Sequence, residues 1–118
     1  MTTRATIDKY FERLKGGGGW DECLSDDMVF TSLTSPAKTI PGKASYLQAT
    51  QRFYASIASA AVRDIIVDGD RACVLTRYTI KPVNGAPSFE SDVAEFFTVH
   101  DDRITAFTIC FDTAPYPR

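Results

Sequence analysis

Apolar side chains near the N-terminus recur with the period of an α-helix. Over residues 3–15 they fall at positions i, i+3, i+4 and i+7 (Ile7, Tyr10, Phe11 and Leu14), which predicts an amphipathic helix. Gly16–Gly19 should end this helix and form a flexible connection, because glycine restricts the backbone least. A short second helix is predicted around Trp20 to Leu24, closed by Asp26–Asp27, and Met28 to Leu33 has the pattern of a strand.

The rest of the chain predicts one more helix and then four strands. The helical period returns at Lys43 and runs to an Ala/Ser-rich stretch near 58–61. Beyond it, apolar and polar residues alternate with period two, which is typical of half-buried strands. The predicted strands are Val62–Asp68, Arg71–Lys81, Phe89–His100 and Arg103–Asp112. This order predicts a single α+β domain over residues 1–118, with about three N-terminal helices covering one face of an antiparallel sheet.

The turns between the last three strands predict which residues lie opposite one another. Asn84–Gly85 and Asp101–Asp102 are both suited to short hairpin turns. With unbroken pairing on either side, each turn fixes the register of its two strands. The predicted pairs include Val74 with Glu95, Thr76 with Val93, His100 with Arg103, Glu95 with Thr108, and Val93 with Cys110.

These registers sort the side chains of the three strands onto two faces. One face combines small and polar groups with two carboxylates, which predicts the wall of a pocket beneath the helices. It holds Val74, Thr76, Tyr78, Ser91, Val93, Glu95, Phe97, Ala106, Thr108, Cys110 and Asp112. The second face holds Cys73, Leu75, Arg77, Asp92, Ala94, Phe96, Phe107, Ile109 and Phe111. The reverse assignment, with the aromatic face as the core and Glu95 toward solvent, stays open at this point.

The second face is mainly large and apolar, apart from a cross-strand ion pair expected between Arg77 and Asp92. A contiguous apolar patch of this kind is unusual on a monomer. We therefore expect a second copy of the chain to cover it and form a homodimer. The expected interface residues are Phe96, Phe107, Ile109 and Phe111.

Composition narrows the classes of partner and compartment. Of 118 residues, 44% are hydrophobic and 24% are charged, which is typical of a globular domain and not of a disordered chain. The net charge of −2 gives no electrostatic reason to expect a nucleic acid or an anionic membrane as partner. The chain has no apolar run of about 20 residues and no secretory signal, so we expect a cytoplasmic protein.

The cysteines and the single histidine give no pattern for a metal site. Cys23, Cys73 and Cys110 are an odd number with no paired spacing, which is typical of reduced thiols. His100 lies beside Asp101–Asp102 at a predicted hairpin tip, where a solvated side chain is expected. We expect no metal and no cofactor.

Three stretches carry a family resemblance that covers nearly the whole chain. They are Asp26–Ser32, the sequence VAEFFTVHDDRITAF that begins at Val93, and the closing FDTAPY that begins at Phe111. In these stretches and in the order of its elements, the chain resembles the SnoaL-like branch of the nuclear transport factor 2-like superfamily. The resemblance implies a cone-shaped, strongly curved sheet around the helices, a deep pocket and, commonly, a homodimer. Isomerases, hydrolases, cyclases and binding modules share this fold, so it does not fix the activity.

The resemblance also implies roles for individual residues. Ketosteroid isomerases of this fold use a helix tyrosine and a protonated acid, which match Tyr10 and Glu95, but their aspartate base is replaced by Ser32. Limonene-epoxide hydrolases have an aspartate near the end of the last strand, which matches Asp112. Their Arg-x-Asp sequence has no counterpart, because Arg77 is followed by a tyrosine and a threonine. In SnoaL-type cyclases a pocket aspartate is the acid/base, a role that Asp112 or Glu95 could fill.

The predicted site joins these residues to their apolar surroundings. Apolar neighbours should desolvate Glu95 and raise its pKa, so that it could act as an acid near neutral pH. We expect Glu95, Asp112 and Tyr10 to be catalytic, acting on a small apolar or polycyclic ligand. The expected pocket wall is Trp20, Phe53, Tyr54, Tyr78, Val93, Phe97, Thr108 and Cys110. Two functions follow: a cofactor-independent isomerase, cyclase or hydrolase, or a non-catalytic module that binds a ligand or dimerises.

Overall fold

The computed structural model describes residues 2–34 and 36–116. In chain order the elements are α1 (Thr3–Lys15), the 3-10 helix η1 (Trp20–Cys23), β1 (Leu24–Ser32), β2 (Lys38–Pro41), α2 (Lys43–Ser56), β3 (Ile57–Asp68), β4 (Arg71–Ile80), β5 (Phe89–His100) and β6 (Arg103–Phe111). The α+β class predicted from the sequence is confirmed. The described residues contain two α-helices and one 3-10 turn, so the expectation of about three helices is met only in part.

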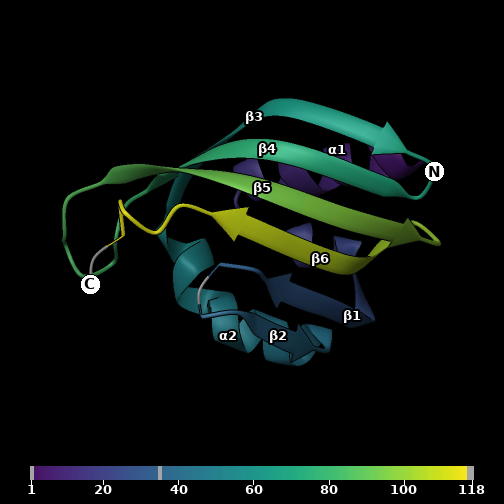
Figure 1. Ribbon diagram of the computed structural model, residues 1–118, viewed down its shortest axis with the longest axis horizontal. Helices are drawn as coiled ribbons and strands as arrows, with labels where there is room; N and C mark the ends of the chain where they lie inside the picture. The colour runs from purple at the N-terminus through teal and green to yellow at the C-terminus, as the bar shows by residue number, and fades with distance from the viewer. Residues whose placement is uncertain (1, 35, 117–118) are drawn as a thin grey trace.

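The strands form one curved sheet in the order β2-β1-β6-β5-β4-β3 (Figure 1). The strands from β3 to β6 are an antiparallel meander, as predicted, and β2 pairs antiparallel with β1. The sheet is nevertheless mixed, because β1 pairs with β6 in parallel. The two strands can run side by side in the same direction because the long segment from β2 to β5 separates them in the chain.

Both helices lie on the inner face of the sheet, where they bury the core. α1 contacts β3, β4 and β5, whereas α2 contacts β1 and β2. The predicted apolar stripe of α1 is confirmed, since Ile7, Tyr10, Phe11 and Leu14 are all buried. The rings of Tyr10 and Phe11 pack on Phe97 from β5 at centroid distances of 5.8 and 6.1 Å.

Several element boundaries differ from those predicted. β1 begins at Leu24, so Asp26–Asp27 belong to an irregular stretch of that strand and do not close a helix. Residues 38–41, which lie between the strand predicted at 28–33 and the helix predicted from Lys43, form strand β2 against β1. α2 ends at Ser56, whose hydroxyl donates to the carbonyl of Phe53, and β3 begins at Ile57 instead of Val62. Pairing of residues 57–61 with β4 extends the strand through the Ala/Ser stretch.

The predicted register between β4 and β5 is confirmed. Val74 lies opposite Glu95, and Thr76 lies opposite Val93. Val74 and Thr76 are fully buried, so this side of the two strands is the inner face. The predicted ion pair on the outer face is also present, with Arg77 donating to Asp92 at 2.9 and 3.1 Å.

The predicted register between β5 and β6 is correct for the first pairs next to the turn and wrong beyond them. His100 lies opposite Arg103 as predicted, across a turn in which Asp101 and Asp102 have φ angles of 50° and 62°. The pairing then shifts, because Val99 lies opposite Ile104 but Thr98 lies opposite Ala106. This β-bulge inserts one residue into β6, and one extra residue moves every later side chain to the other face.

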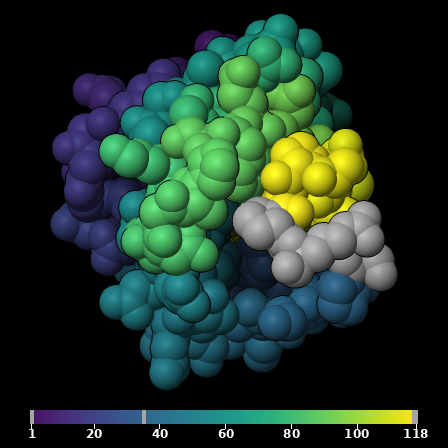
Figure 2. Space-filling model, turned by 90° about the vertical axis from the view of Figure 1, so that its left-hand side faces the viewer, coloured from purple at the N-terminus to yellow at the C-terminus, as the bar shows by residue number. Residues whose placement is uncertain are grey.

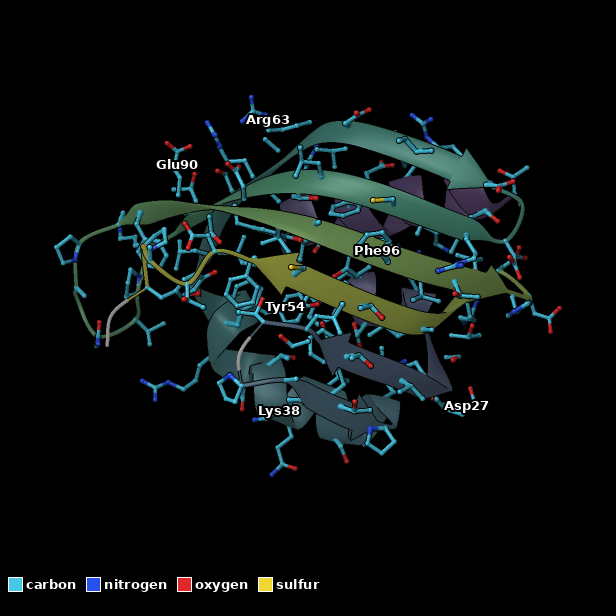
Figure 3. The ribbon with its side chains drawn as sticks, viewed as in Figure 1. Asp27, Lys38, Tyr54, Arg63, Glu90 and Phe96 are labelled. Atoms are coloured by element: carbon cyan, nitrogen blue, oxygen red, sulfur yellow. The ribbon has the colours of Figure 1, made fainter. Side chains whose placement is uncertain are left out.

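The bulge exchanges the two predicted faces of β6. Glu95 lies opposite Ile109 and not opposite Thr108, and Val93 lies opposite Phe111 and not opposite Cys110. The expected dimer interface is therefore wrong for Phe107, Ile109 and Phe111, which lie on the inner face. Phe96 is on the outer face and 40% exposed (Figure 3). The homodimer itself stays a prediction.

Candidate functional site

The inner face of the sheet and α2 enclose a cavity of 220 Å³. Aromatic side chains form most of its wall. The strands contribute Phe30, Tyr78, Phe107 and Phe111, and α2 contributes Tyr46, Phe53 and Tyr54. Figure 2 looks onto the end of the molecule where the β4–β5 loop (green), α2 (teal) and the residues that follow β6, up to 116 (yellow), border a hollow. Ser32, Thr50 and Glu95 add polar atoms to this apolar wall.

Glu95 is a carboxyl group buried in the wall of the cavity. Only 3% of the residue is exposed. Tyr78 donates its phenol hydrogen to Oε1 at 2.6 Å, and Thr76 donates its hydroxyl hydrogen to Oε2 at 2.7 Å. Burial raises the pKa of Glu95 to about 7, although the two hydrogen bonds lower it. Glu95 can therefore exist in both protonation states near neutral pH.

Three tyrosines form a second hydrogen-bonded group in the same region. The Tyr54 hydroxyl lies 2.9 Å from that of Tyr10 and 2.5 Å from that of Tyr46. Burial raises the pKa of all three phenols well above the ordinary value. They remain protonated at neutral pH and can act as hydrogen-bond donors.

The structure distributes the predicted wall residues over two layers. Phe53, Tyr54, Tyr78 and Val93 line the cavity together with Glu95. Trp20 and Phe97 lie outside that lining and form a second layer behind it. Tyr10, which was expected to be catalytic, lies in this second layer and does not line the cavity. Trp20 stacks on the ring of Tyr54 at a centroid distance of 3.8 Å, and Tyr10 reaches the same residue through its hydroxyl. Trp20 and Tyr10 therefore orient the side chain of Tyr54.

Asp112 does not share the cavity with Glu95. It follows the last residue of β6, is exposed, and accepts a hydrogen bond from the backbone N–H of Ala114 at 3.0 Å. The predicted common face for the two carboxylates is therefore wrong, because the bulge in β6 reverses the phase of the strand. Thr108 and Cys110 lie outside the cavity lining for the same reason, and Cys110 is exposed.

Tyr46 and Tyr116 also line the cavity, although neither was predicted to do so. Tyr46 had a usable signal, since positions 46, 50, 53 and 54 share one side of a helix and all four side chains line the cavity. Ser32 lines the cavity as well, at the position where the resemblance places a catalytic aspartate. Tyr116 lies beyond the last strand, where no periodic pattern could place it.

The described part of the chain lacks two further kinds of feature. Across residues 2–34 and 36–116, no group of three or more His, Cys, Asp or Glu side chains is arranged to hold a metal ion. No helix within these ranges is long and apolar enough to cross a membrane. Cys23, Cys73 and Cys110 are free thiols.

Comparison with known proteins identifies the family. Residues 7–107 match the model of the SnoaL-like domain. The chain belongs to the SnoaL-like domain family. One fold can host very different chemistry, so membership shows the fold and leaves the reaction open. No curated protein matches the sequence significantly.

Solved structures with this fold include three whose descriptions name an activity. A candidate ketosteroid isomerase from Kribbella flavida is 24% identical, with a TM-score of 0.73, 98% of this chain covered and 82% of the other. A candidate SnoaL-like polyketide cyclase from Jannaschia sp. CCS1 is 18% identical, with a TM-score of 0.75 and coverages of 98% and 93%. An LEH-like epoxide hydrolase from Mycobacterium tuberculosis is 19% identical, with a TM-score of 0.76 and coverages of 96% and 84%. At these identities the likeness concerns the fold.

Proposed function

We propose that this SnoaL-like protein binds a small, mainly apolar molecule in the cavity and catalyses proton transfer on it without a cofactor. The observation that carries the proposal is the position of Glu95, a desolvated carboxyl group in an aromatic wall. A base works best when its pKa lies near the working pH, and the pKa of Glu95 is about 7. One carboxylate that takes a proton and returns it elsewhere on the same molecule is sufficient for an isomerase.

The tyrosine group supplies the second component of such a reaction. Three phenol hydrogens serve two mutual hydrogen bonds, so one hydrogen is left over. When Tyr10 donates to Tyr54 and Tyr54 donates to Tyr46, the spare hydrogen belongs to Tyr46, which lines the cavity. That hydrogen would stabilise negative charge on a substrate oxygen while Glu95 holds the substrate's proton.

The size of the cavity limits the ligand. Pockets for drug-sized molecules measure roughly 300–1,000 Å³. A cavity of 220 Å³ favours a ligand, or a part of a ligand, of about one ring over a fully enclosed polycyclic molecule.

Cyclohex-3-enone is a suitable probe, because its conversion to cyclohex-2-enone moves one proton from the carbon beside the carbonyl to the far end of the alkene. NMR in D2O would follow both the product and the deuterium taken up. We expect the protein to accelerate the reaction over buffer, with a rate that rises as pH increases through 7. Glu95→Gln should lower the rate by roughly 10²–10⁴-fold, whereas Asp112→Asn, the matched change on an exposed carboxylate, should leave it unchanged.

A non-catalytic binding module is the second candidate. It is favoured by the exposed position of Asp112 and by Glu95, whose two oxygens each accept a hydrogen bond within the protein. In that case the enone would raise the melting temperature by mass action without being converted. Equal conversion rates with wild type, Glu95→Gln and buffer would contradict the catalytic proposal.

A further inference from the structure

Two aromatic side chains separate two hollows at the open end of the sheet. The cavity that contains Glu95 has a neighbouring depression of 360 Å³, and both are lined by Phe53 and Tyr116. Phe53 is fixed within α2. Tyr116 lies beyond the end of β6, so its displacement would break no pairing of the sheet. The movable part of the partition is therefore Tyr116.

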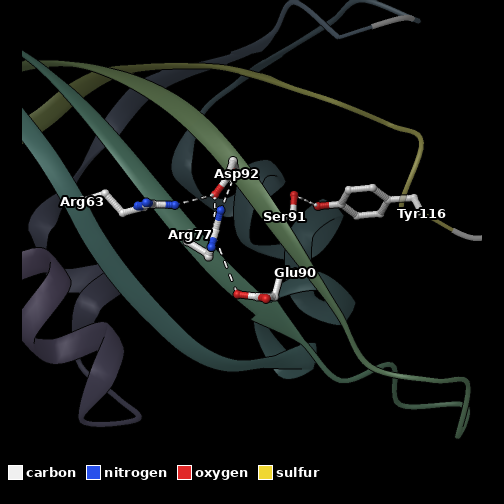
Figure 4. Close-up of polar contacts among 6 residues, drawn as sticks. All are labelled: Arg63, Arg77, Glu90, Ser91, Asp92 and Tyr116. Atoms are coloured by element: carbon white, nitrogen blue, oxygen red, sulfur yellow. Dashed lines mark hydrogen bonds and ion pairs between the residues drawn. The ribbon is translucent and has the colours of Figure 1, made fainter.

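Tyr116 is held over the cavity by a small number of contacts. Its hydroxyl donates to Oγ of Ser91 at 2.9 Å (Figure 4). Its ring packs on Phe89 and Phe111 at centroid distances of 4.9 and 5.1 Å. Ser91 is 2% exposed and lies on the same side of β5 as Glu95. A single neutral hydrogen bond contributes little net stability, so a ligand can displace it.

The segment that carries Tyr116 has a fixed base. The hydroxyl of Thr34 donates to the carbonyl of Phe111 at 3.1 Å and accepts from its N–H at 2.9 Å. Beyond this anchor, Asp112 accepts from the N–H of Ala114, and the N–H of Tyr116 donates to the carbonyl of Thr113. Residues 112–116 thus form a compact turn that is anchored at Phe111 and tied at Ser91.

The outer depression is suited to an apolar chain. Ile80, Val83 and Phe89 line it, and Val83 is 60% exposed. Arg52 and Asn84 are exposed members of the same lining. A hydrocarbon chain that leaves the inner cavity past Tyr116 would cover this exposed apolar surface and gain free energy from its burial.

We propose that Tyr116 is a specificity-determining gate. In its closed position it confines a ligand to the inner cavity; when displaced, it joins the two hollows and admits an elongated ligand. Such a ligand has a compact polar head near Glu95 and a linear apolar tail over the end of α2. The inference rests on the proposed function only in assuming that a ligand occupies the inner cavity, and it requires no catalysis.

A homologous series of 4-alkylphenols, from 4-methylphenol to 4-hexylphenol, tests this gate by isothermal titration calorimetry. With wild type, we expect the affinity to stop rising once the alkyl chain fills the inner cavity. With Tyr116→Ala, it should continue to rise by about fourfold per methylene, the value of one buried CH₂ group. Val83→Ser, which changes only the outer depression, should remove this gain from the Tyr116→Ala protein and leave the binding of 4-methylphenol unchanged.

Two milder variants test the latch with the fold intact. Tyr116→Phe and Ser91→Ala each remove the hydrogen bond, and each should raise the affinity for 4-hexylphenol by about fivefold, the equivalent of one such bond. The double variant should gain no more than either single one. The gate would be overturned if the affinity for the 4-alkylphenols depended on chain length in the same way in wild type and Tyr116→Ala. It would also be overturned if neither protein bound them. Failure of the enone reaction alone would contradict the catalytic proposal and leave this result unaffected.

Discussion

The two faces of β5 place two carboxylates in opposite environments. Glu95 is buried among Thr76, Tyr78 and the aromatic wall, and burial raises its pKa to about 7. Asp92 lies on the outer face, where hydrogen bonds from Arg77 lower its pKa (Figure 4). Both residues face partners on β4, and they are three positions apart in the chain. The side of the sheet, more than the residue type, therefore decides which carboxyl group can exchange protons near neutral pH.

Two neighbouring phenylalanines repeat this comparison for packing. Phe97 is 1% exposed and contacts Tyr10, Phe11 and Phe107. Phe96, the preceding residue, is 40% exposed. The two positions allow the same substitution to be compared inside and outside the core.

The largest expected effect is on the stability of the core. Phe97→Ala should lower the free energy of unfolding by about 4 kcal/mol, because it removes a fully buried ring and leaves a cavity. Phe96→Ala should cost less than about 1 kcal/mol, as is usual for surface positions. Urea unfolding of the two variants measures the difference. Equal losses would show that the two sides of β5 are not distinct in packing.

The next effect is the dependence of stability on pH. Since the pKa of Glu95 is raised from 4.5 to about 7 by folding, the folded state binds more protons than the unfolded state between these values. The contribution of Glu95 to the free energy of unfolding should therefore be fully present below pH 4.5 and should be lost as pH rises through 7. Between pH 5 and pH 8 this one group should account for about 2 to 3 kcal/mol.

Glu95→Gln isolates this contribution, because the amide does not titrate. Urea unfolding at pH 5 and pH 8 should show a smaller decrease for Glu95→Gln than for wild type. Asp92→Asn is the matched control on the same strand and should retain the wild-type decrease. If Glu95→Gln and wild type lost the same unfolding free energy between pH 5 and pH 8, the loss would come from groups other than Glu95.

A smaller effect is expected from the two donors to Glu95. Thr76→Val and Tyr78→Phe each remove a hydrogen bond that favours the charged carboxylate, so each should raise the pKa of Glu95 by about one unit. The pH dependence of unfolding, or of the enone reaction, would report the shift. Arg77→Gln, which alters a neighbouring position on the outer face, should leave the pKa of Glu95 unchanged.

The smallest effect is expected on the outer face itself. Arg77→Gln should raise the pKa of Asp92 toward its ordinary value, and carboxyl NMR would detect the change. Asp92 is stabilised in its charged form, so its contribution is present above the unfolded pKa and is lost as pH falls. At neutral pH the effect on unfolding should be within experimental error, because exposed ion pairs contribute little. A large loss of stability would contradict this view of the outer face.

The sequence predicted the part of the site on β4 and β5 correctly and the part on β6 incorrectly. The β4–β5 register follows from regular alternation across the Asn84–Gly85 turn, and it placed Glu95, Thr76 and Tyr78 on one face. The β5–β6 register depends on one extra residue between Ile104 and Ala106, and a bulge has no strong local signal. The large apolar residues of β6 indicate which of its faces is buried. Assigning Phe107, Ile109 and Phe111 to the core would have required the bulge and excluded Asp112 from the cavity.

The proposed site depends on Glu95 being a desolvated carboxyl group in the cavity wall. Labelling the glutamate side chains with ¹³C and following the carboxyl resonance of Glu95, assigned with Glu95→Gln, against pH measures its pKa directly. We expect a midpoint near 7. A midpoint near 4.5, the ordinary value for glutamate, would show that the carboxyl group is solvated and would contradict both the site and the proposed chemistry.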